Sequence, residues 1–211
     1  MRLPYAPNTP PPASTDPETH AIYTRISSRR HPRPLIPLDL TLLHSPPVAD
    51  GYNAFVGALR TKTIFPASLL ELAICRIAVL NSAVYEWDIH AAIAVKEGIP
   101  KHVLEFARFK TPDEVENHAF ADHPTDQQDS HSPDLTPAQI VTLWYTDELT
   151  RKVKVQDPTF EKLKSLFNER EIVELTTTIA GYNCVSRILV GLDVGENNGK
   201  EMKNLEELYG K

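Results

Sequence analysis

The sequence predicts an all-α protein, and three observations support that prediction. Glycine is scarce, with 8 among 211 residues, and the β-branched alternation typical of a strand is almost absent after Pro47. From there onward, apolar residues recur at spacings of three and four, which is the period of an amphipathic helix. Helix stop signals separate these segments, for example Gly98 with Pro100 just beyond it.

Residues 1–46 are expected to form an extended or disordered, proline-rich arm. Of the 18 prolines, 11 lie within the first 47 residues, and proline fixes φ and removes a backbone donor. The stretch from Pro4 to Pro17 also lacks apolar periodicity. We expect the arm to hang free or to lie across a neighbouring subunit, and we expect removal of residues 1–20 to leave the fold intact.

Four helices are expected in the first part of the remaining chain, over residues 49–59, 66–80, 83–97 and 101–108. The first carries an apolar face at three- and four-residue spacings. Pro66 suits the first turn of the second, and Gly98 ends the third. Between the second and third, Asn81 and Ser82 either break the helix or merely bend it.

Three further helices are expected after a polar surface connection at residues 109–135; they cover residues 136–155, 157–167 and 169–192. The run from Thr136 to Gln139 is a good helix start, and Pro158 suits a first turn. The last of the three carries an apolar stripe that includes Tyr182. A weak helix over residues 200–209 completes the polar C-terminal tail.

Composition excludes several classes of partner and location. The formal net charge of −6 argues against nucleic acid or an anionic membrane surface as the main partner. The apolar stretches are interrupted within about ten residues, too short to span a bilayer. The start of the chain leads into prolines rather than into the apolar region of a secretory signal. Two cysteines make no disulfide framework, and we expect a cytoplasmic protein.

Common cofactor and metal motifs are absent from the sequence. It contains no H-E-x-x-H, G-x-S-x-G or G-x-G-x-x-G pattern. A group of histidines and aspartates in the polar connection has neither helical spacing nor cysteine, so a solvated loop explains it better than a metal site. The group comprises His118, Asp122, His123, Asp126 and His131. We therefore predict no metal and no cofactor.

The segment that carries chemistry lies in the expected helix 83–97. Glu86 and His90 are four residues apart and so share a helix face. A carboxylate beside an imidazole can orient the ring and raise its basicity, which suits general acid–base catalysis. Glu71 lies one helix earlier and completes the cluster if the two helices form a hairpin. An ordinary surface salt link is the alternative interpretation of the same spacing.

These residues resemble the carboxymuconolactone decarboxylase family, which includes the alkylhydroperoxidase D-like proteins. The run from Glu86 to Gly98 matches the family pattern E-x-x-x-H-x-x-x-A-x-x-x-G without a gap, and Glu71 precedes it as in the family. The clear resemblance covers residues 47–108. It implies an all-α, alkylhydroperoxidase D-like helical bundle built on a helical hairpin. It also implies a homo-oligomer with its active pocket near a subunit interface.

The resemblance also implies a division of the chain and a branch of the family. We expect an arm at 1–46, a family-like helical domain at 47–195 and a polar tail at 196–211. Peroxidase members carry a C-x-x-C pair, and Ala83 and Glu86 occupy those positions here. A dithiol peroxidase needs a low-pKa thiolate and a resolving partner, which Cys75 and Cys184 do not restore. Glu86 is similar to the decarboxylase branch.

The expected function is therefore cofactor-free proton transfer at carbon on a lactone or oxo acid, by a lyase or an isomerase-type enzyme. His90 donates or takes the proton, Glu86 orients the His90 ring and Glu71 tunes both. Tyr85 and Trp87 are candidates for lining the pocket, although buried packing is the favoured role of Trp87. The substrate is a small carboxylic acid or lactone. The alternative is a non-catalytic helical oligomer or binding protein in which Glu86 and His90 merely fasten an interface. A cluster facing an open cavity favours the enzyme, and a closed cluster favours the alternative.

Overall fold

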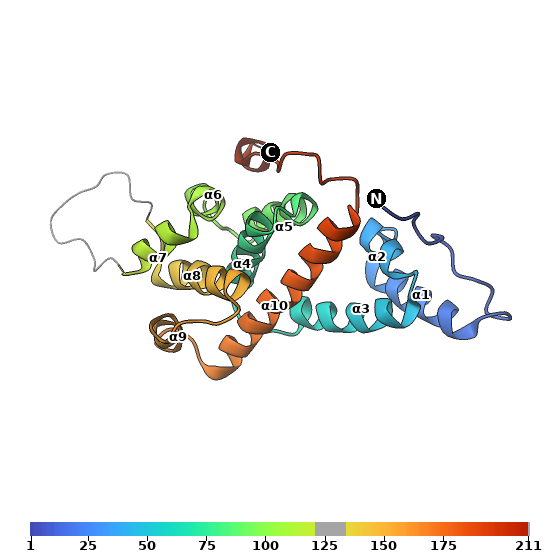
Figure 1. The fold of residues 1–211 in the computed structure, drawn as a ribbon. Coiled ribbons are helices and arrows are strands. Elements are labelled where there is room, and N and C mark those ends of the chain that lie inside the picture. The colour runs from blue at the N-terminus through green and yellow to red at the C-terminus, as the bar shows by residue number, and fades with distance from the viewer. Residues whose placement is uncertain (121–133, 211) are drawn as a thin grey trace. The chain divides into compact units, whose positions relative to one another are not determined.

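The computed structural model describes residues 1–120 and 134–210, and every regular element in those ranges is a helix (Figure 1). The all-α prediction is confirmed. In chain order the helices are α1 (Pro17–Arg30), α2 (Pro37–Leu42), α3 (Pro46–Thr61), α4 (Ala67–Leu80), α5 (Val84–Lys96), α6 (Lys101–Phe109), α7 (Pro112–Phe120), α8 (Pro137–Arg151), α9 (Asp157–Lys164), α10 (Glu169–Leu192) and α11 (Leu205–Tyr209).

The chain divides into two compact units. The first combines Met1–Thr63 with Ile188–Asn197, and the second combines Ile64–Arg187 with Asn198–Lys211. The predicted division into an arm at 1–46, a helical domain at 47–195 and a tail at 196–211 stays a prediction.

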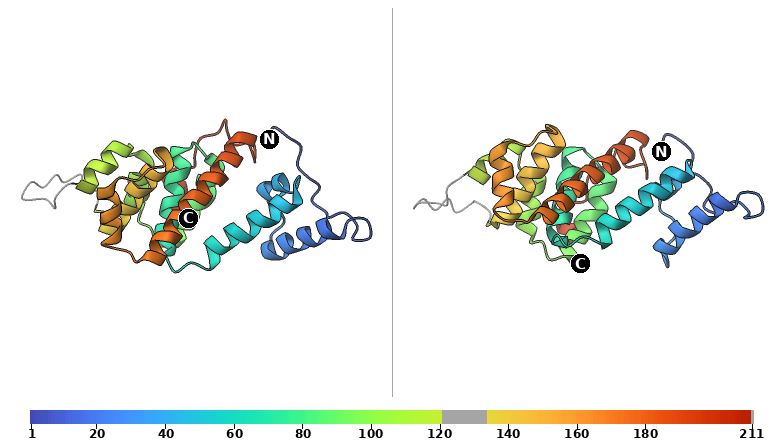
Figure 2. Two further views of the ribbon diagram at one scale, coloured as in Figure 1. Left: turned by 60° about the horizontal axis from the view of Figure 1, so that its bottom comes forward. Right: turned by 90° about the horizontal axis from the view of Figure 1, so that it is seen from below.

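The first unit contains two helices that the proline pattern did not reveal. Residues before Asp16 form no regular helix, as expected, but Asp16 then caps α1 by accepting a hydrogen bond from the Thr19 N–H (3.0 Å). Figure 2 shows α1 (blue) beside α3 (cyan) in both views, and the two helices pack together. The shared core is small, which explains the weak periodicity; its buried members are Ala6, Ile22, Tyr23, Ile26, Leu43 and Ala49.

The N-terminal segment is held by its own unit rather than hanging free. The Met1 ammonium group bonds Glu196 (2.7 Å), and the Ala6 N–H donates to the Leu40 carbonyl (3.1 Å). Ala6 is also only 5% exposed. Residues 1–20 thus contribute one small apolar residue and the chain terminus to the first unit, whereas the effect of removing them stays a prediction.

The second unit is built on the hairpin of α4 and α5, and α4 also packs against α6 and α8. Ser82 has a φ of 54°, so the chain breaks between α4 and α5 rather than bending through one continuous helix. Gly98, with a φ of 83°, ends α5 as the sequence predicts. The hairpin brings the side chains of α4 against those of α5, which is the condition that the predicted cluster needs.

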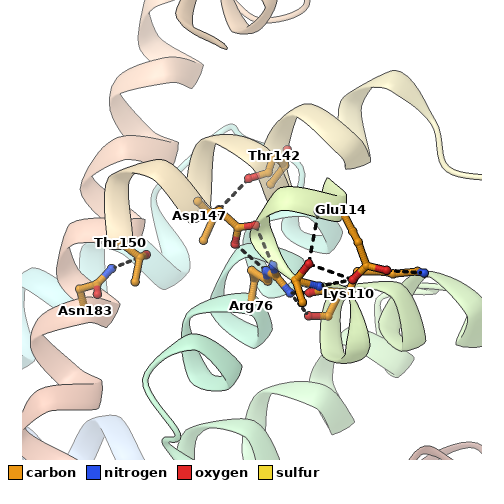
Figure 3. A network of polar contacts seen from close by, with 10 residues as sticks. Arg76, Lys110, Glu114, Thr142, Asp147, Thr150 and Asn183 are labelled. Atoms are coloured by element: carbon orange, nitrogen blue, oxygen red, sulfur yellow. Dashed lines mark hydrogen bonds and ion pairs between the residues drawn. The ribbon is translucent and has the colours of Figure 1, made fainter. Parts of the chain in front are cut away.

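A buried ion pair ties α4 to α8 in this unit (Figure 3). Arg76 donates through Nε and Nη2 to the two carboxylate oxygens of Asp147, at 2.5 and 2.7 Å. Its Nη1 donates to the carbonyls of Ala107 and Lys110, at 2.7 and 2.8 Å. Both charged residues are at most 3% exposed. The fork therefore also fixes the end of α6 against α4.

Four sequence predictions about elements need correction. α9 ends at Lys164 rather than at Phe167. The expected connection at 109–135 contains α7, which Thr111 and Glu114 start by bonding each other's backbone N–H groups (2.8 and 3.3 Å). α8 ends at Arg151 rather than near 155, because Val153 turns to a φ of 62°. The last helix is limited to Leu205–Tyr209. None of the helices in the described ranges is long and apolar enough to cross a membrane.

Candidate functional site

The centre of the candidate site is a hydrogen bond between the two helices of the hairpin. Nδ1 of His90 on α5 lies 2.6 Å from Oε2 of Glu71 on α4. The two residues are 7% and 8% exposed. A carboxylate can only accept, so a carboxylate at this position fixes the ring tautomer with its proton on Nδ1.

Glu86 lies one helical turn before His90 and has a different environment from the one predicted. It is 1% exposed, and neither carboxyl oxygen has a hydrogen-bond partner among the described residues. Burial raises its pKa well above the ordinary 4.5, which favours the neutral acid over the carboxylate. The bond that orients His90 comes from Glu71 instead, because the hairpin places that carboxylate at Nδ1.

Cys75 lies one turn after Glu71 on α4 and belongs to the same cluster. It is fully buried and unpaired. Burial raises the pKa of its thiol, and the nearby carboxyl groups of Glu71 and Glu86 raise it further. The sequence analysis considered Cys75 only as a cysteine that does not restore the C-x-x-C pair of the peroxidase members. Its four-residue spacing from Glu71 was the available signal that it faces the same side of α4.

Tyr182 is the residue that sequence reasoning placed in the core but not in the site. It lies on α10 and is 3% exposed. Its ring meets the His90 imidazole edge to face, with centroids 4.9 Å apart and an interplanar angle of 84°. The place of Tyr182 in the apolar stripe of its helix does not indicate that its ring contacts His90 on another helix.

The two residues predicted to line a pocket have different surroundings. Trp87 is fully buried, and its indole N–H donates to the Lys203 carbonyl (3.0 Å). The Arg108 guanidinium lies 5.1 Å from the centre of its ring. Trp87 thus anchors the C-terminal segment on α5. Tyr85 is half-buried, and its role in binding a substrate stays a prediction.

The candidate metal ligands of the polar connection fall mostly outside the described residues. Asp122, His123, Asp126 and His131 lie there, whereas His118 is described on α7. Its ring meets Phe106 with centroids 5.1 Å apart, and burial lowers its pKa. Within residues 1–120 and 134–210, no three histidine, cysteine, aspartate or glutamate side chains are grouped to hold a metal ion.

The fold is shared with solved structures of low sequence identity. One is described as an alkylhydroperoxidase AhpD core, an uncharacterized peroxidase-related protein from Ralstonia eutropha JMP134. Its TM-score is 0.64 at 19% identity, over 92% of this chain and 90% of that one. A second is a protein of unknown function from Agrobacterium tumefaciens, described as a putative antioxidant defence protein AhpD. Its TM-score is 0.57 at 18% identity, over 76% of this chain and 94% of that one.

These similarities show the fold. The chain has the AhpD-like all-helical fold, as the motif from Glu86 to Gly98 predicts. No family model matches the sequence, and no curated protein matches it. The chemistry of the site is therefore inferred from its geometry: His90 is hydrogen-bonded to Glu71, and the buried carboxyl group of Glu86, whose pKa is raised, lies one turn away.

Proposed function

We propose that the protein is an enzyme that transfers a proton at carbon of a small lactone or oxo acid, as a lyase or isomerase without a cofactor. The observation that carries the proposal is the buried hydrogen bond between His90 and Glu71 at 2.6 Å. A carboxylate that holds an imidazole in one tautomer supports its work as a general base and then as a general acid.

His90 is the group that moves the proton. Through Nε2 it takes a proton from carbon or returns one, while Glu71 holds Nδ1–H and stabilises the imidazolium that forms. In a decarboxylation, the electrons of the breaking carbon–carbon bond enter an enolate, which His90 then protonates. In an isomerisation, His90 takes a proton from one carbon and returns it to another. The substrate's own carbonyl accepts the electrons in both reactions.

A dithiol peroxidase is not supported, although the names of the solved neighbours refer to peroxidases. The thiol of Cys75 is buried and its pKa is raised, which opposes formation of the attacking thiolate. Cys184 is exposed, and the structure pairs neither cysteine with a partner. Ala83 and Glu86 occupy the positions of the expected C-x-x-C pair.

The second candidate function is a non-catalytic helical oligomer or binding protein. It is favoured by the near-complete closure of the cluster, since His90 and Glu71 are each less than a tenth exposed and bond each other. Under either function we propose a homo-oligomer in the cytoplasm, and under the enzyme a small carboxylic acid or lactone as substrate.

Proton NMR in deuterated buffer tests the proposal directly. A panel of oxo acids and carboxylated or plain lactones is incubated with wild type, with His90→Gln, and with His102→Gln as the matched control. His102 is an exposed histidine on α6. We expect deuterium at carbon, or loss of the carboxylate, with wild type and with His102→Gln only. Equal behaviour of His90→Gln and wild type contradicts the proposal. A lower melting temperature of His90→Gln without any turnover by wild type favours the structural role.

A further inference from the structure

We propose that Glu86 donates a hydrogen bond, as a neutral acid, to the oxygen of the enolate, and that the substrate is an uncharged carbonyl compound such as a lactone, ketone or ester. This inference rests on the proposed proton-transfer function and narrows its substrate class. It makes isomerisation or exchange at the carbon beside the carbonyl the reaction, rather than loss of a carboxylate.

The first argument is the isolation of the Glu86 carboxyl group. Its two oxygens are buried, and neither has a hydrogen-bond partner among the described residues. Buried polar atoms in folded proteins nearly always have partners, so an exception needs a reason. A group that can donate, lies one turn from the His90 base and has no internal partner is suited to an oxygen of a bound molecule.

The second argument is the charge of the surroundings. Burial alone accounts for the raised pKa of Glu86, with no arginine or lysine lowering it. The carboxyl group of Glu71 is also close enough to act electrostatically on the Cys75 thiol, one turn along α4, so this neighbour is acidic rather than basic. A carboxylic acid kept neutral by such surroundings can donate a hydrogen bond at neutral pH.

The third argument is that the buried cation nearest in sequence is already used. Arg76 adjoins Cys75 on α4, but its guanidinium bonds both oxygens of Asp147 and two backbone carbonyls. A protonated His90 is likewise matched by Glu71. No other lysine or arginine is buried among the residues that the structure describes. A substrate carboxylate beside Glu71 would thus have no buried cation to offset it, and like charges repel strongly when buried. An uncharged carbonyl meets no such opposition.

The chemical step balances without any further reactant. Nε2 of His90 takes the proton from the carbon beside the carbonyl, and the electrons of that C–H bond form a carbon–carbon double bond. The carbonyl π electrons move to the oxygen, which accepts the hydrogen bond from the Glu86 hydroxyl. Return of the proton from His90 to the same carbon gives exchange, and its return to the far end of a conjugated system gives isomerisation.

Matched substrates test the charge assignment. We would measure exchange of a β,γ-unsaturated γ-lactone and of the same lactone bearing a ring carboxylate, by NMR in deuterated buffer. We expect kcat/KM for the uncharged lactone to exceed that for the carboxylate by at least about tenfold. A faster carboxylate overturns this inference alone. Absence of exchange from both compounds overturns the proton-transfer function itself, so the two failures are distinct.

Two substitutions test the role of Glu86. Glu86→Leu removes the donor and should lower kcat by about 100- to 1,000-fold, the usual cost of losing an oxyanion donor. Glu86→Gln keeps a neutral donor and should stay within about tenfold of wild type. Glu97→Gln, at the exposed end of α5, is the control. If the Gln variant is as inactive as the Leu variant, Glu86 acts as a titrating group and the inference fails.

The protonation state of Glu86 can also be measured in wild type without substrate, so that this test does not depend on the folding of a variant. The infrared spectrum of wild type at pH 7 should contain the carbonyl stretch of a protonated carboxylic acid, and the spectrum of Glu86→Gln should lack it. If wild type has no such band, Glu86 is ionised and the inference is overturned, whatever the turnover.

Discussion

At the scale of single residues, Glu86 carries a stability cost that the fold does not recover. Its carboxyl group has lost water without gaining a partner among the described residues. Leaving a buried polar group unsatisfied costs about 1–3 kcal/mol. Glu71 and His90, one turn or one helix away, satisfy each other instead. A local loss of stability of this kind is typical of functional sites.

Glu86→Leu should therefore raise the free energy of unfolding by about 1–3 kcal/mol, because an apolar side chain of similar size has no unsatisfied polar atoms. Thermal denaturation of wild type and variant measures the change. Glu97→Leu, at an exposed position of α5, should leave the melting temperature near that of wild type. A clear loss of stability in Glu86→Leu would indicate that the carboxyl group fastens the structure.

The raised pKa of Glu86 also predicts how stability depends on pH. The folded protein holds the proton above 4.5, where the unfolded chain releases it. Stability should therefore fall as the pH rises from 4.5 towards the folded-state pKa, with a limiting slope of about 1.4 kcal/mol per pH unit for one proton. Among the described residues, the titratable groups of the same cluster are Cys75, on which Glu86 acts electrostatically, Glu71 and its partner His90.

Urea denaturation at a series of pH values measures this slope. Glu86→Gln should flatten it, because the amide does not titrate, whereas His102→Gln should leave this part of the curve unchanged. The same slope in wild type and in Glu86→Gln would show that Glu86 has an ordinary pKa.

At the scale of helices, α4 contributes residues both to the candidate site and to a buried ion pair with α8. Glu71 and Cys75 belong to the candidate site, while the neighbouring Arg76 reaches Asp147 on α8 (Figure 3). A buried ion pair is weak evidence for net stability, since both charges lose water. Removal of one partner is nevertheless strongly destabilising, because it leaves the other charge buried alone.

Arg76→Met should lower the free energy of unfolding by about 3–5 kcal/mol. Combining it with Asp147→Leu should recover part of that loss, since no buried charge is then left. Chemical denaturation of the two single variants and the double variant gives the coupling. The exposed Arg25–Asp50 pair is the control, and Arg25→Met should leave the melting temperature nearly unchanged. Additive losses in the double variant would contradict the pairing.

Helix limits were predictable where local signals were strong. The stripe of α10 predicts the limits Glu169–Leu192, and the structure has the same limits. α7 was missed because it is short and polar and its start depends on a reciprocal bond between Thr111 and Glu114. The end of α8 was placed too late because nothing in the sequence requires Val153 to adopt a positive φ.

At the scale of the whole molecule, the N-terminal segment is a structural part of the first unit. Tyr5 accepts from the Gly195 N–H (2.9 Å), and the Tyr23 hydroxyl donates to the Pro7 carbonyl (3.0 Å). Ala6 adds to the small core. Few apolar residues stabilise this unit, so bonds from the segment matter more than its composition indicates.

Deletion of residues 2–15 should thus loosen the first unit while the second stays protected. Hydrogen exchange measured by mass spectrometry should show faster exchange in α1–α3 and unchanged exchange in α4 and α8. Deletion of residues 2–3 alone, which spares Tyr5, Ala6 and Pro7, is the milder control. Unchanged exchange in α1–α3 would mean that the segment is dispensable, as its composition alone indicates.

The sequence by itself determined the all-α class and the common helix face of Glu86 and His90, because both depend on spacing along a helix. The hairpin of α4 and α5, and with it the place of Glu71 beside that face, was only implied by the family resemblance of the motif. Spacing places side chains on a common face and the motif marks which face matters. Only the tertiary structure decided that Glu71, rather than Glu86, orients His90, and that Tyr182 and Cys75 join them. The physical reason is that hydrogen bonds and desolvation depend on which side chains meet across helices. The periodicity of a single helix carries no information about which side chains of other helices it contacts.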